Sequence, residues 1–308
     1  MDKRAIGSLQ VSLVGIGCNN FGGRIDYAAT ERVVLAALDE GINFFDTADV
    51  YGGTKSEEFL GKALVRRRDE AIIATKFGMQ VAEDKKGASP AYIRQALEDS
   101  LRRLNTDRID LYQLHAPDDT VPIADTLAAL NELVQAGKVR EIGCSNFSAE
   151  QLRQAAAAVA PGAARFVSVQ NHFSLLHREP EKEVIPECDR LGIAFLPYFP
   201  LANGLLSGKY HKGEAPPEGS RIQLGGRFDA MLSDENLGKV EALRHFVQSR
   251  GHSLLDLAFS WLAMFPVVAS VIAGATKPEQ ARANARAVGW QLSQGEMAEI
   301  DRIVGVTD

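Results

Sequence analysis

The sequence contains little cysteine. Its 308 residues include three cysteines, Cys18, Cys144 and Cys188, which lie far apart in the chain. A disulfide framework or a structural zinc site needs more cysteines at closer spacing. The first residues also lack the apolar segment of a signal peptide. We therefore expect a protein of a reducing compartment, located in the cytoplasm and without a bound metal.

The sequence has no excess of positive charge. It carries 34 Lys and Arg residues against 40 Asp and Glu, which gives a formal net charge of -6. Its longest basic run is Arg66-Arg67-Arg68. Surfaces that bind nucleic acid are usually basic patches or stripes. The charge balance therefore predicts no nucleic-acid partner.

One uncharged run, residues 257–275, is long enough for a membrane span. Asp256 precedes this run, Pro266 interrupts it, and the residues after the proline are rich in valine. Proline breaks helices, whereas β-branched residues favour strands. A buried helix followed by a buried strand explains the run better than a span does, so we expect no contact with a membrane.

Elsewhere the chain alternates short apolar runs with helical patterns. This alternation is typical of parallel strands that helices cover on the outside. Eight such strands predict an α/β protein with a (β/α)8 TIM barrel, and we expect one domain over residues 1–308. The predicted strands are residues 13–16, 42–45, 71–75, 108–114, 139–143, 166–169, 193–197 and 269–272.

Capping residues mark several helix boundaries. Thr30 is expected to begin a helix that runs to residue 40, and Ser89-Pro90 is expected to begin another. Ser148 has the position of a helix cap, and Gln151 completes a capping box. These signals place helices between the predicted strands.

Two further segments complete the predicted fold. Residues 5–11 suit an N-terminal β-hairpin at the bottom of the barrel, and a long irregular loop, residues 201–233, follows the seventh strand. An open doubly wound sheet is the competing architecture. Its glycine fingerprint is incomplete here, because Gly15-Ile16-Gly17 is followed by Cys18-Asn19-Asn20.

Four titratable residues follow the ends of three consecutive predicted strands. Asp46 and Tyr51 follow the second strand, Lys76 the third and His115 the fourth. Active sites of α/β barrels form at the carboxyl ends of the strands. Each residue alone also has a purely structural explanation, such as a turn cap or a hydrogen-bonded core side chain. Together they predict one catalytic site.

The four side chains suit the reduction of a carbonyl group. Hydride delivery places negative charge on the carbonyl oxygen, which then needs a proton and hydrogen bonds. Tyr51 can supply the proton, and the charge of Lys76 is expected to lower the pKa of that phenol. Asp46 would keep Lys76 protonated, and a ring N–H of His115 would hold the substrate oxygen beside Tyr51.

Three longer motifs resemble those of the aldo-keto reductase superfamily. They are GINFFDTADVYG at residues 41–52, with Ser56-Glu57 and residues 60–64 after it, DLYQLH at 110–115 and GCSNF at 143–147. The resemblance covers nearly the whole chain. It implies a (β/α)8 barrel, a catalytic tetrad of Asp46, Tyr51, Lys76 and His115, and Tyr51 as the general acid.

The resemblance also implies a nicotinamide cofactor. Ser145, Asn146 and Gln170 match residues that hold the carboxamide, and Tyr198 matches an aromatic residue that stacks on the nicotinamide ring. The segment 201–210 resembles one that wraps the pyrophosphate, and residues 274–280 resemble the loop at the adenosine phosphate, with Asn284 at the adenine. Within these segments the expected contacts are Leu201, Asn203, Gly204, Leu206, Lys209, Gly274, Thr276, Lys277 and Gln280.

The sequence departs from this pattern at a few positions. Many NADP-preferring relatives have arginine where this chain has Gln280, and Lys277 and Thr276 are expected to compensate. We expect NADPH as cofactor and leave NADH open. Phe199 replaces a frequent serine, and His172-Phe173 replaces a frequent Glu-Tyr pair.

The expected function is reduction of small aldehydes or ketones, or oxidation of sugar-like alcohols. Two alternatives are a cofactor-binding, redox-sensing subunit with little turnover and a metal-dependent barrel hydrolase. Tyr51, His115 and Asn146 are expected to line the substrate pocket, with Phe21 and Phe77 either as apolar walls or as core residues. The substrate, the reaction direction and the oligomeric state stay open.

Overall fold

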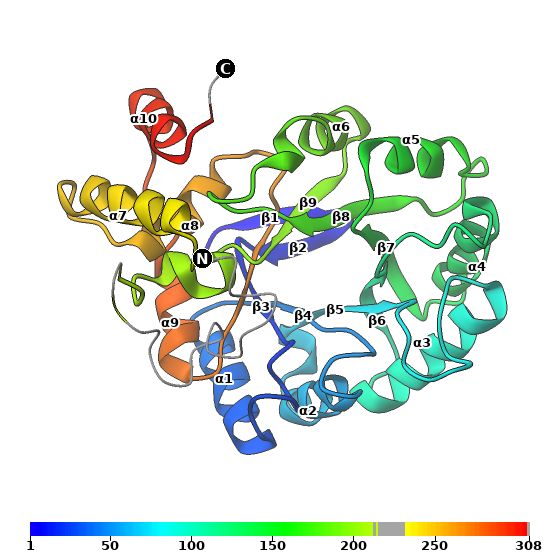
Figure 1. Ribbon diagram of the computed structural model, residues 1–308. Coiled ribbons are helices and arrows are strands. Elements are labelled where there is room, and N and C mark those ends of the chain that lie inside the picture. The colour runs from blue at the N-terminus through cyan, green and yellow to red at the C-terminus, as the bar shows by residue number, and fades with distance from the viewer. Residues whose placement is uncertain (212–213, 215–231, 307–308) are drawn as a thin grey trace.

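A computed structural model describes residues 1–211, 214 and 232–306. Eight parallel strands form a closed barrel in the order β10-β3-β4-β5-β6-β7-β8-β9 (Figure 1), which confirms the predicted (β/α)8 fold. The strands are β3 (Val14–Gly17), β4 (Phe44–Asp46), β5 (Ile72–Phe77), β6 (Ile109–Leu114), β7 (Val139–Ser145), β8 (Phe166–His172), β9 (Ala194–Tyr198) and β10 (Val271–Gly274).

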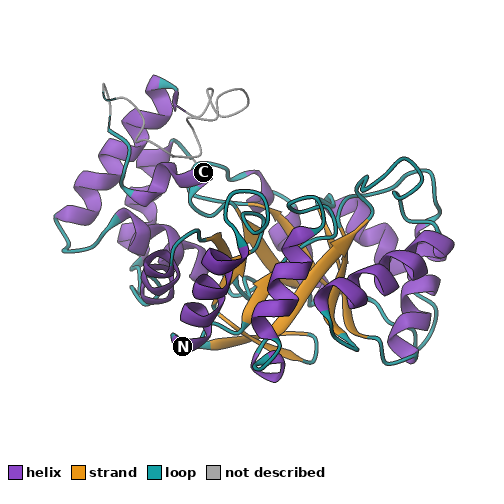
Figure 2. Cartoon of the chain, turned by 90° about the horizontal axis from the view of Figure 1, so that it is seen from below, coloured by secondary structure: helices purple, strands orange, loops and turns teal. Residues whose placement is uncertain are grey.

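Helices surround the strands on the outside of the barrel (Figure 2). They are α1 (Tyr27–Asp39), α2 (Lys55–Leu64), α3 (Pro90–Leu104), α4 (Ile123–Gln135), α5 (Ala149–Ala157), α6 (Val184–Leu191), α7 (Asp234–Gln248), α8 (Leu254–Ala263), α9 (Pro278–Arg286) and α10 (Gln294–Val304). Short 3-10 helices occur at η1 (Arg68–Glu70), η2 (Glu179–Glu181) and η3 (Ala202–Ser207). Most of the predicted loop at 201–233, namely 212–213 and 215–231, lies outside the described residues.

The helix caps were predicted correctly at two of three positions. Ser89 caps α3, and Ser148 and Gln151 form the capping box of α5. The predicted start of α1 at Thr30 was wrong. Asp26 caps this helix by accepting a hydrogen bond from the backbone N–H of Ala29 at 2.8 Å. An aspartate was available four residues earlier, and aspartate is at least as good a cap as threonine.

The N-terminal hairpin closes the bottom of the barrel, as predicted. Strands β1 (Lys3–Ile6) and β2 (Leu9–Ser12) pair in antiparallel fashion. Ile6 and Leu9 are fully buried in one cluster with side chains of the barrel interior. The guanidinium of Arg4 donates to the backbone carbonyls of Ala263 and Phe265, so it ties the hairpin to the end of α8.

Residues 257–275 form a helix and then a strand, as predicted, since the run covers most of α8, Pro266 and β10. No helix in the described part of the chain is long and apolar enough to cross a membrane.

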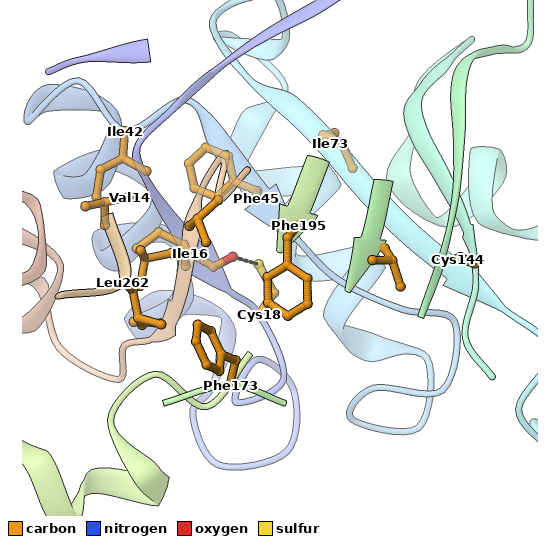
Figure 3. Packing of buried hydrophobic residues seen from close by; sticks show 14 of the residues in the cluster. Val14, Ile16, Cys18, Ile42, Phe45, Ile73, Cys144, Phe173, Phe195 and Leu262 are labelled. Atoms are coloured by element: carbon orange, nitrogen blue, oxygen red, sulfur yellow. Dashed lines mark hydrogen bonds between the residues drawn. The ribbon is translucent and has the colours of Figure 1, made fainter. Parts of the chain in front are cut away.

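Alternation along the strands decides which side chains enter the barrel. On β4, Phe44 belongs to the interior cluster, whereas Phe45 packs in the cluster between barrel and helices. Figure 3 shows Phe45 in this outer cluster with Ile73 and Phe195. Because successive side chains of a strand point to opposite faces, the residue after Phe45 points inward again. That residue is Asp46.

Candidate active site

A buried ion pair lies at the base of the site. The Nζ of Lys76 on β5 donates to both carboxylate oxygens of Asp46 at 2.7 Å and to the carbonyl of Thr47 at 2.9 Å. Both charged side chains are almost completely buried. Burial acts to lower the pKa of Lys76, but the charge and hydrogen bonds of Asp46 and Tyr51 outweigh it and raise this pKa. Lys76 therefore stays an ammonium.

Tyr51 lies beside this ion pair. Its ring centroid is 5.2 Å from the Lys76 ammonium nitrogen. Burial raises the pKa of Tyr51 above its usual value, and the charge and hydrogen bond of Lys76 lower it by less. The expected direction of the Lys76 effect is present, but the net shift is upward because desolvation of the phenolate is larger. In this state the phenol holds its proton.

His115 faces Tyr51 with its ring edge-on. The two ring centroids are 5.7 Å apart, and the planes make an angle of 81°. Burial, and then the charge of Lys76, lowers the pKa of His115 to about 3. The imidazole is therefore neutral at ordinary pH, and a neutral imidazole carries one N–H that can donate to a ligand.

These side chains open into a cavity of about 720 Å³, a size typical of small-molecule sites. Asp46, Tyr51 and His115 line it, and Lys76 lies beneath. Most residues expected to contact the cofactor also line this cavity, namely Ser145, Asn146, Gln170, Tyr198, Leu201, Asn203, Gly204, Lys209, Gly274, Thr276, Gln280 and Asn284. Leu206 is buried in the core instead, and Lys277 precedes α9 without lining the cavity.

The polar wall beside His115 is already hydrogen-bonded. The Nδ2 of Asn146 donates to the carbonyl of His115 at 2.9 Å, and the hydroxyl of Tyr198 donates to the Oδ1 of Asn146 at 2.9 Å. The hydroxyl of Ser145 donates to the backbone carbonyl of Gln170 at 2.7 Å. The wall thus holds amide and hydroxyl groups in fixed positions.

The ring of Tyr198 is backed by two histidines. His172 lies parallel to Tyr198 with a centroid separation of 5.5 Å, and His177 stacks on His172 at 3.8 Å. Phe199 contacts both Tyr198 and His172 edge-on. One face of the Tyr198 ring is therefore packed against aromatic rings, while the same residue lines the cavity.

Residues of η3 and of the start of α9 line another part of the cavity. In η3, Asn203 and Gly204 adopt left-handed φ values of 56° and 101°. At the start of α9, the Oε1 of Gln280 accepts hydrogen bonds from the backbone N–H groups of Thr276 at 2.7 Å and Lys277 at 3.2 Å. A side-chain oxygen thus sits where a helix N-terminus favours an anion.

The sequence model of the aldo/keto reductase family matches residues 13–304, and eight parallel strands place the tetrad at one end of a barrel. The chain belongs to the aldo/keto reductase family. Membership makes it an oxidoreductase of carbonyl or alcohol groups.

The named relatives of this aldo/keto reductase include a reductase, a probable channel subunit and a dehydrogenase. It is 36% identical to the aldo-keto reductase YhdN of Bacillus subtilis, over 96% of this chain and 91% of that protein. It is 35% identical to a probable voltage-gated potassium channel subunit beta of Oryza sativa, over 91% of this chain and 88% of that one. The glycerol dehydrogenase AKR11B4 of Gluconobacter oxydans superposes with a TM-score of 0.86 at 33% identity, over 99% and 95% of the two chains.

Several cavity residues of this aldo/keto reductase were not predicted from sequence. Asn19, Asn20 and Arg24 line the cavity from the loop after β3, and Met79 and Ala116 line it from the loops after β5 and β6. They follow the carboxyl ends of β3, β5 and β6. Location after a strand end, which indicated the tetrad, could therefore have indicated these residues too.

The sequence leaves two possibilities for Phe21 and Phe77, as apolar walls of the pocket or as core residues. Both are core residues. Their side chains are completely buried in the core outside the barrel, and neither lines the cavity. Phe77 stacks on Tyr112, with ring centroids 4.7 Å apart.

Proposed function

We propose that this protein is an NAD(P)H-dependent reductase of small aldehydes and ketones, with Tyr51 as the general acid. The observation that carries the proposal is the buried Asp46–Lys76 ion pair beneath Tyr51 and His115 at the base of a cavity. In this proposal Tyr51 would be the proton donor, Lys76 the fixed positive charge and His115 the neutral hydrogen-bond donor for a bound carbonyl oxygen. Those are the groups that a developing alkoxide requires.

The residues around the cavity fit a nicotinamide cofactor. Ser145, Asn146 and Gln170 bring hydroxyl and amide groups to one wall, which suits a primary carboxamide. The cavity side of Tyr198 suits stacking on a planar ring. The backbone at Gly204 can approach a pyrophosphate closely, because glycine has no side chain there. When bound, the cofactor would supply the hydride.

The protein's own side chains then handle the proton. Tyr51 holds its proton because burial raises its pKa, so it is ready to donate to the substrate oxygen. Lys76, held as an ammonium by Asp46, favours the phenolate that remains. His115 would donate from its neutral ring to the same oxygen and fix its position. In the direction of alcohol oxidation, which the named activity of the Gluconobacter relative suggests, Tyr51 would act as the base.

The same cavity could serve a cofactor-binding regulatory subunit, and the channel-subunit relative is the reason to consider one. The complete tetrad favours turnover, because pure binding requires neither the buried ion pair nor a protonated phenol beside it. A metal-dependent hydrolase is less well supported. Within residues 1–211, 214 and 232–306, no three His, Cys, Asp or Glu side chains gather in a way that could hold a metal ion.

The proposal is tested by mixing the purified protein with NADPH and an activated aromatic aldehyde and following the nicotinamide absorbance. A steady decrease that needs both protein and aldehyde is expected. Tight NADPH binding without turnover over a broad panel of carbonyls and alcohols would support the regulatory subunit instead.

We propose NADPH as the preferred cofactor, with a small margin over NADH. The backbone N–H groups of Thr276 and Lys277 suit an adenosine 2'-phosphate, but both already donate hydrogen bonds to the Oε1 of Gln280. We expect Gln280→Arg to raise the ratio of kcat/KM for NADPH over NADH about ten-fold, because a guanidinium forms paired charge-assisted bonds with phosphate. Gln280→Glu should lower the same ratio. Steady-state kinetics with both cofactors measure it, and equal ratios in the two variants would contradict the assignment.

His115 is expected to act without changing its charge. With its pKa at about 3, the imidazole does not titrate between about pH 5 and 8. The pH profile of kcat for His115→Gln should therefore run parallel to that of the wild type over this range, about ten-fold lower because the donor is less well placed. A limb near neutral pH that is present in the wild type and absent from the variant would show that His115 titrates there.

A further inference from the structure

Two glutamine side chains hold the carboxylate of the tetrad. The Nε2 of Gln170 on β8 donates to the Oδ1 of Asp46 at 2.8 Å, and the Nε2 of Gln113 on β6 donates to the same oxygen at 3.4 Å. Lys76 binds both oxygens of this carboxylate from β5. Asp46 is thus held from three strands besides its own.

Gln113 contacts neither the cavity nor bulk solvent. Its side chain is completely buried, it does not line the cavity, and Asp46 is the partner of its amide nitrogen. Its position follows from register, because Gln113 pairs with Lys76 on one neighbouring strand and with Gly143 on the other. A Cβ at Gly143 would lie 2.5 Å from the Oγ of Ser168 and 3.3 Å from the Cγ of Gln113, so the glycine leaves room for both side chains.

Burial of the polar Gln113 side chain costs free energy, and packing alone does not account for a polar residue at this position. Two residues earlier on β6, Leu111 fills the barrel interior with an apolar side chain. Gln113 points the same way, yet its Oε1 is buried without a partner among the described residues. An unpaired buried acceptor is unfavourable. The favourable interaction that Gln113 makes here is the hydrogen bond from its Nε2 to Asp46.

We propose that Gln113 and Gln170 are positioning residues that orient Asp46 and balance its charge, and thereby control how readily Tyr51 gives up its proton. The inference rests on the proposed function of Tyr51. Gln170 differs from Gln113 in that it also lines the cavity while its Nε2 donates to Asp46.

The direction of the effect follows from the charges around Tyr51. The negative charge of Asp46 raises the pKa of this phenol, whereas Lys76 lowers it. An amide donor on Asp46 disperses part of that negative charge, so removing the donor should raise the pKa of Tyr51 further. Among the described residues, the titratable groups that interact with Asp46 or its partner Lys76 include Cys18, Tyr51, His115 and Asp49. A Gln113 variant changes none of these residues.

The decisive variant is Gln113→Met, which keeps the length of the side chain and removes the donor. Ionisation of Tyr51 is followed by ultraviolet absorbance after a rapid jump to alkaline pH, with the Tyr51→Phe signal subtracted. We expect the midpoint to move upward by about half to one pH unit. In parallel, kcat for reduction should fall about five- to ten-fold with KM unchanged, because a weaker acid donates its proton more slowly.

Tyr112→Phe is the matched control, since Tyr112 is the neighbour of Gln113 on β6 and points to the outer core. It should leave both the midpoint and kcat as in the wild type. If Gln113→Met also matches the wild type in midpoint and kcat, the inference is overturned while the function of Tyr51 stands. If no variant or wild type turns over, the proposed function fails, and the absorbance midpoint alone still decides the role of Gln113.

A second variant covers the case in which Gln113→Met does not fold. Gln113→Glu keeps the shape and can donate to Asp46 only while its own carboxyl is protonated. Its rate of reduction should be near that of the wild type at acidic pH and should fall as the pH rises and this carboxyl ionises. A rate that follows the wild type at every pH would overturn the inference.

Discussion

Tyr51→Phe is expected to lower kcat for carbonyl reduction by about a thousand-fold, the scale of a lost general acid. Phenylalanine keeps the ring that packs edge-on against His115 and removes only the hydroxyl. The proton must then come from water, while the Asp46–Lys76 pair and the cavity remain. The Kd of NADPH should therefore stay as in the wild type, because the hydroxyl is not among the groups expected to hold the cofactor.

Single-turnover kinetics and a fluorescence titration with NADPH measure the two quantities separately. Tyr112→Phe again provides the control, because it removes a phenol hydroxyl that is buried without a partner in the described structure. Its activity should equal that of the wild type. Wild-type activity in Tyr51→Phe would refute the role of Tyr51, and an equal loss in both variants would point to damaged folding.

The barrel and the tetrad could be predicted from the sequence because both leave patterns within short segments of the chain. Apolar runs of the right length mark strands, and a titratable residue just beyond a run marks the active end of a barrel. Asp46 is the last residue of β4, and His115 directly follows β6, in agreement with this pattern. Lys76 lies one residue before the end of β5, yet its inward direction follows from the same alternation.

Gln113 shows where this reasoning stops. It lies inside the buried strand β6, so its sequence context predicts a strand residue and does not identify its polar partner. Its contact with Asp46 joins residues 67 positions apart and depends on how the barrel closes. The same holds for Gln170, whose bond to Asp46 spans 124 positions. Sequence patterns report the face of a strand, whereas contacts across the barrel need the register of all strands.

The sign of the pKa shift at Tyr51 could not be predicted either. The sequence identifies the neighbouring charge of Lys76, which favours the phenolate. It does not report how far the hydroxyl is removed from water, and burial is the larger of the two effects. Leu206 is a similar case, because only the fold of η3 turns its side chain into the core.

Lys76→Met is expected to abolish activity and to lower the free energy of unfolding by about 3 kcal/mol, the lower end of the range for breaking a buried ion pair. The variant leaves the carboxylate of Asp46 buried without its ammonium partner. The amide groups of Gln170 and Gln113 still bind this carboxylate, which is why we expect the lower end. Urea unfolding followed by circular dichroism measures the loss of stability.

The double variant Asp46→Leu with Lys76→Met separates stability from catalysis. It removes both charges and fills the space with apolar atoms, so part of the lost free energy of unfolding should return, because the unpaired charge is gone. The recovery stays incomplete, because the buried amide donors of Gln170 and Gln113 lose their acceptor. Activity should stay absent, since no ammonium remains to stabilise the phenolate of Tyr51. A double variant that is as unstable as Lys76→Met would show that the ion pair itself, and not the charge left behind, supports the fold. Partial activity in either variant would mean that Tyr51 can donate its proton without Lys76.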